Sequence, residues 1–213
     1  MPAHRAVRRT RRTRAAGKAL FDRLAGAIGL ALISPLLAAT ALAIRIDSPG
    51  PVFYTQTRVG QDGKPFTMWK FRSMYIDSDA RRASVVKAGG DAGNEVMFKD
   101  RQDPRITRVV RWIRRRSIDE LPQLINVVRG DMSLVGPRPA LPVEVAKYDA
   151  EALRRLLVKP GLTGLWQISG RSDLSWASTV ALDRHYVENR GGALDAKIFA
   201  GTLRAVIGGK GAY

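Results

Sequence analysis

Residues 24–44 read LAGAIGLALISPLLAATALAI and contain no charged side chain. At 1.5 Å per residue, a helix over this stretch would span a hydrocarbon core of roughly 30 Å. A helix on the surface of a soluble domain would carry a polar stripe, and this stretch has none. The stretch therefore predicts a membrane helix, and it decides how the rest of the chain is interpreted.

The middle of the stretch carries Ser34-Pro35. Proline removes one helical hydrogen bond and kinks the chain, which a membrane helix tolerates where a serine or a neighbouring group satisfies the freed carbonyl. Both flanks are basic, so the positive-inside rule places both ends on the cytoplasmic face. A straight helix cannot achieve this, and we favour a re-entrant helix broken at Ser34-Pro35. A plain kinked span, with the rest of the chain exported, is the alternative.

A cleaved signal peptide is a further alternative, because Ala39-Thr40-Ala41 resembles a small-residue cleavage site after a basic start. The apolar run exceeds the length of about 7–15 residues that is usual in such peptides. Residues 1–18, which precede the membrane helix, are too polar to pack and predict a basic, disordered tail.

The whole chain is strongly basic, with 36 Lys and Arg residues against 19 Asp and Glu and a net charge of +17. This excess implies a polyanionic partner such as nucleic acid, an anionic lipid surface or a phosphorylated substrate; a merely solvated basic surface is the plainer explanation. Nucleic acid is disfavoured, because the tail lacks interleaved aromatic residues and no DNA-binding motif occurs. The absence of cysteine excludes disulfides, thiolate metal sites and a cysteine nucleophile.

After the membrane helix, the chain alternates short strand-like and helical segments. Val52–Val59 and Pro65–Phe71 flank a glycine-rich turn and predict a β-hairpin. Helices are expected at 106–116, from 117 to near 129, at 142–157 and at 175–188. A loop with some helix is expected at 77–103, and an irregular segment at 159–167. The fold class is therefore α+β, mainly helical with a small β-hairpin.

Asp119-Glu120 is the carboxylate pair that stands out. It follows three arginines, so both acids should be ionised. One interpretation is structural, since Ser117-x-x-Glu120 fits a helix capping box. Pro122 instead favours Asp119 as the N-cap, because a proline at the third helical position costs no hydrogen bond. Asp119 would then lie at a helix N-terminus, where bound phosphate is stabilised.

Gly136-Pro137-Arg138-Pro139 is the second candidate. Two prolines fix the backbone around one arginine, whose guanidinium then suits bidentate phosphate binding. A stiff turn with an exposed arginine is the alternative. The common phosphate-binding loops, G-x-x-x-x-G-K-[ST] and G-x-G-x-x-G, do not occur.

Several short segments occur in a specific order: Phe21-Asp22, Ser34-Pro35, Gln56-x-Arg58-Val59-Gly60, Lys70–Met74, Ser117–Gln123, Gly130–Pro139 and Pro160–Gln167. In this order and spacing they resemble the bacterial sugar transferases, also called monotopic phosphoglycosyl transferases or polyprenyl-phosphate hexose-1-phosphate transferases. The resemblance runs from Lys18 to Tyr213. The ending, residues 194–213, is similar to that of the exopolysaccharide-initiating branch.

The resemblance implies a covalent mechanism. Asp119 would attack the sugar-bearing phosphate of a UDP-sugar and expel UMP, and undecaprenyl phosphate would then take the sugar phosphate from the aspartyl intermediate. Glu120 would bind Mg²⁺, which suits one or two carboxylates together with phosphate oxygens. Arg138 would hold phosphate, and Lys70, Arg72 and Asp131 would be further site residues.

The resemblance also implies the organisation of the chain: a basic disordered tail at 1–18, a re-entrant membrane helix at 19–46 and a cytoplasmic catalytic domain at 47–213. The enzyme would lie on the cytoplasmic face of the bacterial inner membrane and contact anionic lipids. A non-catalytic scaffold of a polysaccharide assembly complex is the remaining alternative, and it predicts that Asp119 and Glu120 are dispensable. The sequence leaves open the sugar, the glycan pathway and whether the chain forms a homo-oligomer.

Overall fold

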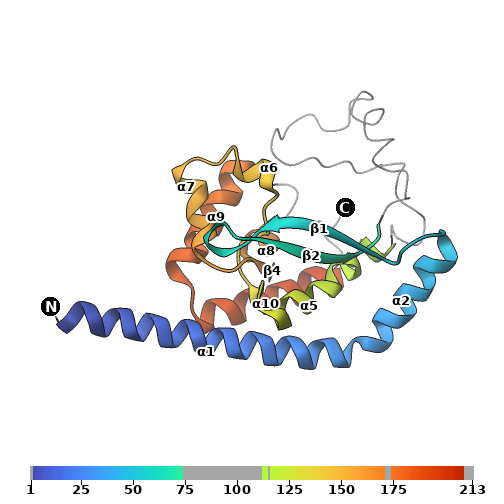
Figure 1. The fold of residues 1–213 in the computed structure, drawn as a ribbon, viewed down its shortest axis with the longest axis horizontal. Helices are drawn as coiled ribbons and strands as arrows, with labels where there is room; N and C mark the ends of the chain where they lie inside the picture. Colours follow the sequence, from blue (N-terminus) through green and yellow to red (C-terminus); the bar gives the residue numbers. More distant parts are fainter. Residues whose placement is uncertain (1, 74–111, 115, 171–173, 209–213) are drawn as a thin grey trace.

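The computed structural model describes residues 2–73, 112–114, 116–170 and 174–208, without the side chains of 2–14 and 206–208 (Figure 1). The loop expected at 77–103 and most of the helix expected at 106–116 lie outside the described residues. The described part is mainly helical and contains two small two-stranded sheets. It is therefore α+β, as the sequence predicts, although with one more sheet than expected.

Two helices form the N-terminal part, α1 (Pro2–Leu32) and α2 (Ser34–Asp47), and they are bent by 60° at the break between them. The Ser34 hydroxyl donates to the carbonyl of Ala31 at 2.8 Å, which is the carbonyl that Pro35 leaves without its helical donor. No single helix of the described residues is long and apolar enough to cross a membrane, whereas this bent pair is, by length and composition. The predicted break at Ser34-Pro35 is thus confirmed as a bend within the apolar stretch, between the end of α1 and the start of α2.

Helix α1 runs without interruption through position 18, so the predicted boundary between tail and membrane helix is not an end of secondary structure. The alanines and arginines of this region are good helix formers, which accounts for the continuity. Figure 1 shows α1 along one edge of the molecule, beneath α5 and α10 in this view, with α2 turning upward at its far end.

The predicted hairpin is confirmed as β1 (Phe53–Val59) and β2 (Pro65–Phe71), joined through the short 3₁₀ helix η1 (Gln61–Gly63). The strands are antiparallel, with Phe53 opposite Phe71. At the turn, Gly63 has a φ of 77°, a conformation that glycine adopts without a steric penalty.

The segment with the carboxylate pair begins with a 3₁₀ helix, η2 (Ile118–Gln123), and continues as α5 (Leu124–Arg129), which ends at Gly130 with a φ of 88°. Ser117, in the left-handed conformation, is the residue before the first turn, and its side chain caps nothing. Both predicted caps are therefore wrong: Asp119 lies inside the first turn, and the capping box does not form. The 3₁₀ geometry accommodates Pro122 within the turn.

The glycine-rich segment predicted as irregular contains a strand. β4 (Gly161–Thr163) pairs in parallel with β3 (Ser133–Val135), and a short helix, α8 (Leu165–Ile168), follows. A Cβ atom on Gly161 would collide with the backbone of Gly136, and one on Gly136 would lie 2.5 Å from the Lys159 carbonyl oxygen. These glycines allow a close backbone approach that local sequence patterns do not reveal.

The predicted helix at 142–157 is divided into α6 (Pro142–Val145), α7 (Ala150–Leu153) and the 3₁₀ helix η3 (Arg154–Leu157). The cause is Asp149, whose side chain accepts a hydrogen bond from the backbone amide of Ala152 and so begins a new helix. The predicted helix at 175–188 is confirmed as α9 (Trp176–Asn189), and α10 (Gly192–Gly208) follows it.

Candidate active site

A cavity of about 330 Å³ lies among the hairpin, η2 and the loop after β3, and it contains most of the predicted site residues. Asp119, Glu120, Lys70 and Arg138 all line it. Its charged lining, as far as the structure describes it, consists of two carboxylates and five cationic side chains: Arg58, Lys70, Arg114, Arg116 and Arg138. This excess of positive charge suits a ligand with several phosphate charges.

The two adjacent acids differ in environment. Burial raises the pKa of Asp119 to about 6 and the negative charge of Glu120 adds to this shift, while Lys70 and Arg114 oppose it. Burial also opposes the ionisation of Glu120, but Lys70 outweighs it, with help from Arg138, so the pKa of Glu120 is lowered. At neutral pH both groups are therefore predominantly carboxylates.

Lys70 is the partner of Glu120 across the cavity. Its Nζ donates to Glu120 Oε1 at 2.8 Å, and the Glu120 side chain is 33% exposed. The neighbouring part of β2 is held by the fully buried Asn126 of α5, whose side chain bonds the Trp69 amide at 3.1 Å and the Thr67 carbonyl at 2.7 Å. This anchoring to α5 fixes the strand that carries Lys70 relative to the carboxylates.

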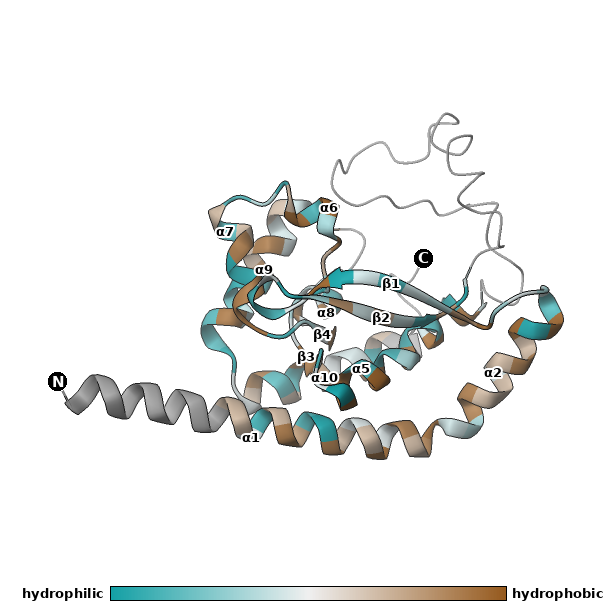
Figure 2. Cartoon of the chain, viewed as in Figure 1, coloured by the Kyte–Doolittle hydropathy of each residue, from teal (hydrophilic) through white to brown (hydrophobic). Residues whose placement is uncertain are grey.

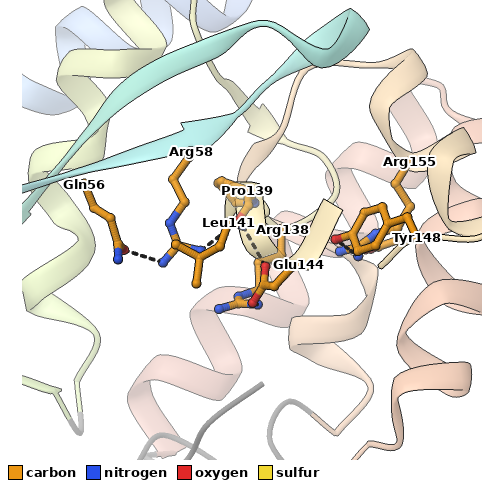
Figure 3. Close-up of polar contacts among 9 residues, drawn as sticks. Gln56, Arg58, Arg138, Pro139, Leu141, Glu144, Tyr148 and Arg155 are labelled. Atoms are coloured by element: carbon orange, nitrogen blue, oxygen red, sulfur yellow. Dashed lines mark hydrogen bonds and ion pairs between the residues drawn. The ribbon is translucent and has the colours of Figure 1, made fainter. Parts of the chain in front are cut away.

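Arg138 is oriented by a buried acid on the following helix. Glu144 Oε1 lies 3.3 Å from Arg138 Nη1, and Glu144 Oε2 accepts the Leu141 amide at 2.7 Å. Figure 3 shows these groups close together at the end of the hairpin. The pair restricts the guanidinium and leaves it on the cavity wall.

Arg58 is a cavity residue that the sequence analysis did not select. Its two terminal nitrogens donate to the Pro139 carbonyl at 3.0 Å and to Gln56 Oε1 at 2.7 Å (Figure 3). Burial, aided by the nearby Arg138, lowers the pKa of Arg58 to about 10, so it still carries its charge at neutral pH. Its place in the Gln56-x-Arg58 motif was the available signal. The spacing did not reveal its contact with Gly136-Pro137-Arg138-Pro139, which we call the arginine loop.

Two predicted site residues lie elsewhere. Arg72 is buried and donates to the Ser48 and Pro49 carbonyls at 2.7 and 3.0 Å, so it ties the end of the hairpin to the segment after α2. Asp131 accepts a hydrogen bond from Asn126 at 3.3 Å beside the end of α5. Neither is among the residues that line the cavity.

A second buried charge cluster lies behind the arginine loop. Arg155 binds Asp183 through Nε at 2.8 Å and Nη2 at 2.7 Å, and it also donates to the Tyr148 hydroxyl at 2.8 Å. Trp176 covers the guanidinium, with 5.2 Å between its ring centroid and the guanidinium carbon. Burial raises the pKa of Asp183 to about 6, while Arg155 and the nearby Arg138 oppose this shift. The cluster therefore lies beside the loop that carries Arg138.

Comparison with known proteins agrees with this geometry. The sequence model of the family described as bacterial sugar transferase matches residues 13–209. The chain belongs to the bacterial sugar transferase family. This membership confirms the resemblance of the motifs and the prediction of an enzyme.

Three relatives illustrate the membership. The chain is 42% identical to the exopolysaccharide production protein ExoY of Rhizobium meliloti, over 92% of this chain and 88% of that protein. It is 41% identical to an undecaprenyl-phosphate galactose phosphotransferase of Salmonella typhimurium and 43% identical to an undecaprenyl-phosphate glucose phosphotransferase of Komagataeibacter xylinus. Each alignment covers 92% of this chain, but only 41% and 37%, respectively, of these longer proteins.

Proposed function

We propose that this sugar transferase moves a sugar 1-phosphate from a UDP-sugar to undecaprenyl phosphate, with release of UMP. The two phosphotransferases among its relatives are named for this acceptor. The observation that carries the proposal is the buried Asp119 beside Glu120 and Lys70, in a cavity whose lining is mainly cationic. A nucleophile at this position would face a diphosphate that the surrounding cations neutralise.

The first step forms a covalent intermediate. The Asp119 carboxylate attacks the sugar-bearing phosphorus, a new bond forms between this phosphorus and the carboxylate oxygen, and the bond to the bridging oxygen breaks. UMP leaves with the bridging oxygen and its electron pair. Lys70, Arg58 and Arg138 bind phosphate oxygens and stabilise the charge that develops.

The second step regenerates the enzyme. A phosphate oxygen of undecaprenyl phosphate attacks the same phosphorus, and the Asp119 carboxylate leaves with the electrons of its bond to phosphorus. The product is a sugar diphosphate lipid. No proton has to be transferred in either step, which fits a site whose two acids are both ionised.

The carboxylates also fit Mg²⁺, provided that the substrate supplies further ligands. Among the described residues, no group of three or more His, Asp or Glu side chains gathers that would hold a metal without substrate. Mg²⁺ needs only one or two carboxylates when it shares phosphate oxygens with a substrate, and Glu120 would hold it. When bound, the ion would supply charge neutralisation for the diphosphate.

The bent apolar helices suit a re-entrant membrane element with the catalytic domain on the cytoplasmic face of the inner membrane. One side of α1 exposes large apolar side chains, with exposed fractions of 56% to 76% at Leu20, Phe21, Leu24, Ile28 and Leu32. Figure 2 shows hydrophobic residues along both α1 and α2. Such a surface stabilises the enzyme beside a lipid substrate, where the soluble donor also has access.

The test is UMP release from a panel of UDP-sugars, with purified enzyme in lipid nanodiscs, Mg²⁺ and undecaprenyl phosphate. We expect one or a few donors to give UMP together with a lipid-linked sugar phosphate. Without acceptor, the same donor should give UMP only up to the amount of enzyme, together with a labelled protein. Turnover without a labelled protein would exclude the covalent route, and absence of UMP with every donor would favour the scaffold.

A further inference from the structure

A partly buried polar network joins α1 to the catalytic domain just before its uncharged stretch begins. Lys18 Nζ lies 2.8 Å from Asp195 Oδ2 of α10 and 3.2 Å from Asp22 Oδ2 on its own helix. Asp22, whose side chain is 5% exposed, also accepts a hydrogen bond of 2.6 Å from the Ser133 hydroxyl of β3. One lysine thus links two carboxylates that belong to different elements.

The network continues to the strand that leads into the arginine loop. The Tyr186 hydroxyl, on α9, lies 2.8 Å from Asp195 Oδ1 and 2.9 Å from the Val135 carbonyl oxygen. The Ser133 hydroxyl lies 2.9 Å from the same Val135 oxygen. Gly136-Pro137-Arg138-Pro139 follows directly after Val135. Each hydroxyl has a single proton to donate, so the firm link from α1 to the backbone that presents Arg138 is the hydrogen bond from Ser133 to Asp22, two positions before Val135 on β3.

Close packing on the same face of α1 makes this coupling specific for one rotation of the helix. Gly26, four residues after Asp22, lies against α5, where an added Cβ would be 3.1 Å from Val127 Cγ1. The guanidinium of Arg23 packs against Gly130 at the end of α5, where it occupies the space that a Cβ atom would take. The large apolar side chains of α1 lie on its other side and are exposed. The i, i+4 spacing of Lys18, Asp22 and Gly26 places these residues on one polar and glycine face of α1, which packs against the catalytic domain.

We propose that Lys18, Asp22, Ser133, Tyr186 and Asp195 form an interlock that fixes the rotation and the depth of α1 relative to the catalytic cavity. In the proposed reaction, on which this inference rests, they are positioning residues for the lipid acceptor. The donor arrives from water, and its binding does not depend on how deeply α1 lies in a bilayer. The phosphate of the acceptor is held at the depth of the lipid headgroups. The second step, its attack, therefore requires that the cavity lie at that same depth, whereas the first step does not.

The experiment separates the two steps in Asp22→Asn and Asp195→Asn variants. With undecaprenyl phosphate in nanodiscs, we expect sugar-phosphate transfer to fall by about 10–100-fold, the effect expected of small misplacements. UMP release in a single turnover without acceptor, and transfer to a short, water-soluble polyprenyl phosphate in detergent, should stay within about twofold of the wild type. Glu151→Gln, which removes a carboxylate from the exposed ion pair with Arg184, is the matched control and should change none of the three rates.

A milder variant keeps the test valid if the carboxylate variants do not fold. Tyr186→Phe removes one hydroxyl and retains the buried ring, and it should weaken transfer to the bilayer acceptor selectively, in the same direction. Because the chain contains no cysteine, one cysteine introduced at Ile28 can carry a spin label that reports the depth of α1. The label should shift in depth in Asp22→Asn and remain in place in Glu151→Gln.

Two results would overturn the interlock. If all three rates fall together, the network merely stabilises the fold; if none falls, it does not position the helix. Neither result depends on the proposed function being wrong, since that function fails only if the wild-type enzyme releases no UMP.

Discussion

Asp119 and Asp183 are two buried carboxylates whose pKa burial raises to about 6, but their surroundings differ. Asp183 is sealed, with a side-chain exposure of 1%, and Arg155 binds it from a distance of 2.7 Å beneath an aromatic ring. Asp119 borders the cavity, has the like charge of Glu120 beside it, and Lys70 bonds Glu120 instead. A raised pKa therefore does not by itself single out a nucleophile; what distinguishes Asp119 in the proposed mechanism is that it borders the cavity.

The largest effect is expected when Asp119 is exchanged for asparagine. Asp119→Asn preserves the shape and removes the attacking charge, so UMP release should fall on the order of 10⁴-fold or more, as for other covalent nucleophiles. Release should be followed in a single turnover, together with the loss of protein labelling by the donor. Thermal unfolding should be nearly unchanged. An asparagine variant with more than about one per cent of wild-type activity would remove Asp119 from this role.

The second prediction concerns the buried ion pair of Arg155 and Asp183. Arg155→Met leaves the Asp183 carboxylate buried without its cation, and should lower the free energy of unfolding by about 3–5 kcal/mol. For a chain of this size, that corresponds to a fall in Tm of roughly 6–20 °C. Differential scanning fluorimetry in nanodiscs measures the change. Arg155→Met combined with Asp183→Asn should recover part of the loss, because no unpaired charge remains; a double variant less stable than the single one would contradict this explanation.

The third prediction concerns Lys70, the cation that is hydrogen-bonded to Glu120 in the cavity. Lys70→Met should lower kcat/KM for the donor by about a hundredfold, the effect of losing a cation at a developing charge. It should also raise the pKa of both carboxylates, because Lys70 favours their ionised forms. The acid side of the pH profile should then move to higher pH. Lys64→Met, on the exposed turn of the same hairpin, is the control and should leave the profile in place.

The smallest expected effect is the pH dependence of the wild-type enzyme. In the proposed mechanism Asp119 attacks as a carboxylate. Its pKa is raised to about 6, so the reactive form is present above this pH and is lost as the pH falls through it. In single-turnover UMP release, kcat/KM for the donor should decline by about tenfold per pH unit below about 6. A profile that is flat down to pH 4.5, with intact protein, would show that ionisation of Asp119 does not limit the reaction.

Part of this architecture could be predicted from local patterns. The hairpin follows from two strand-like runs around a glycine turn, and the bend at Ser34-Pro35 follows from the missing proline N–H. The motifs also selected four residues that line one cavity: Lys70, Asp119, Glu120 and Arg138. The hairpin and the bend could be predicted because each depends on neighbours along the chain, and the order of the motifs drew attention to the four cavity residues.

Other inferences failed for residues whose contact partners are distant in the sequence. Lys70 and Arg72 are two positions apart, but Arg72 follows the end of β2 and binds the segment after α2 instead of facing the cavity. The strand β4 went unrecognised because its glycines are explained only by the loop that packs on them. Arg58 and Asp183 were not selected because their connection to the arginine loop spans long stretches of chain.

By itself, the sequence determined a strongly basic enzyme of the sugar transferase family, with a bent pair of apolar helices and an adjacent pair of acids. Hydrophobicity, the missing proline donor and motif order are local properties, which is why they can be read without coordinates. Only the tertiary structure decided that Lys70 pairs with Glu120, 50 positions away, and that Asp22 binds Ser133, 111 positions away. Such contacts depend on how whole elements pack, and no local spacing encodes the direction in which a side chain finally points.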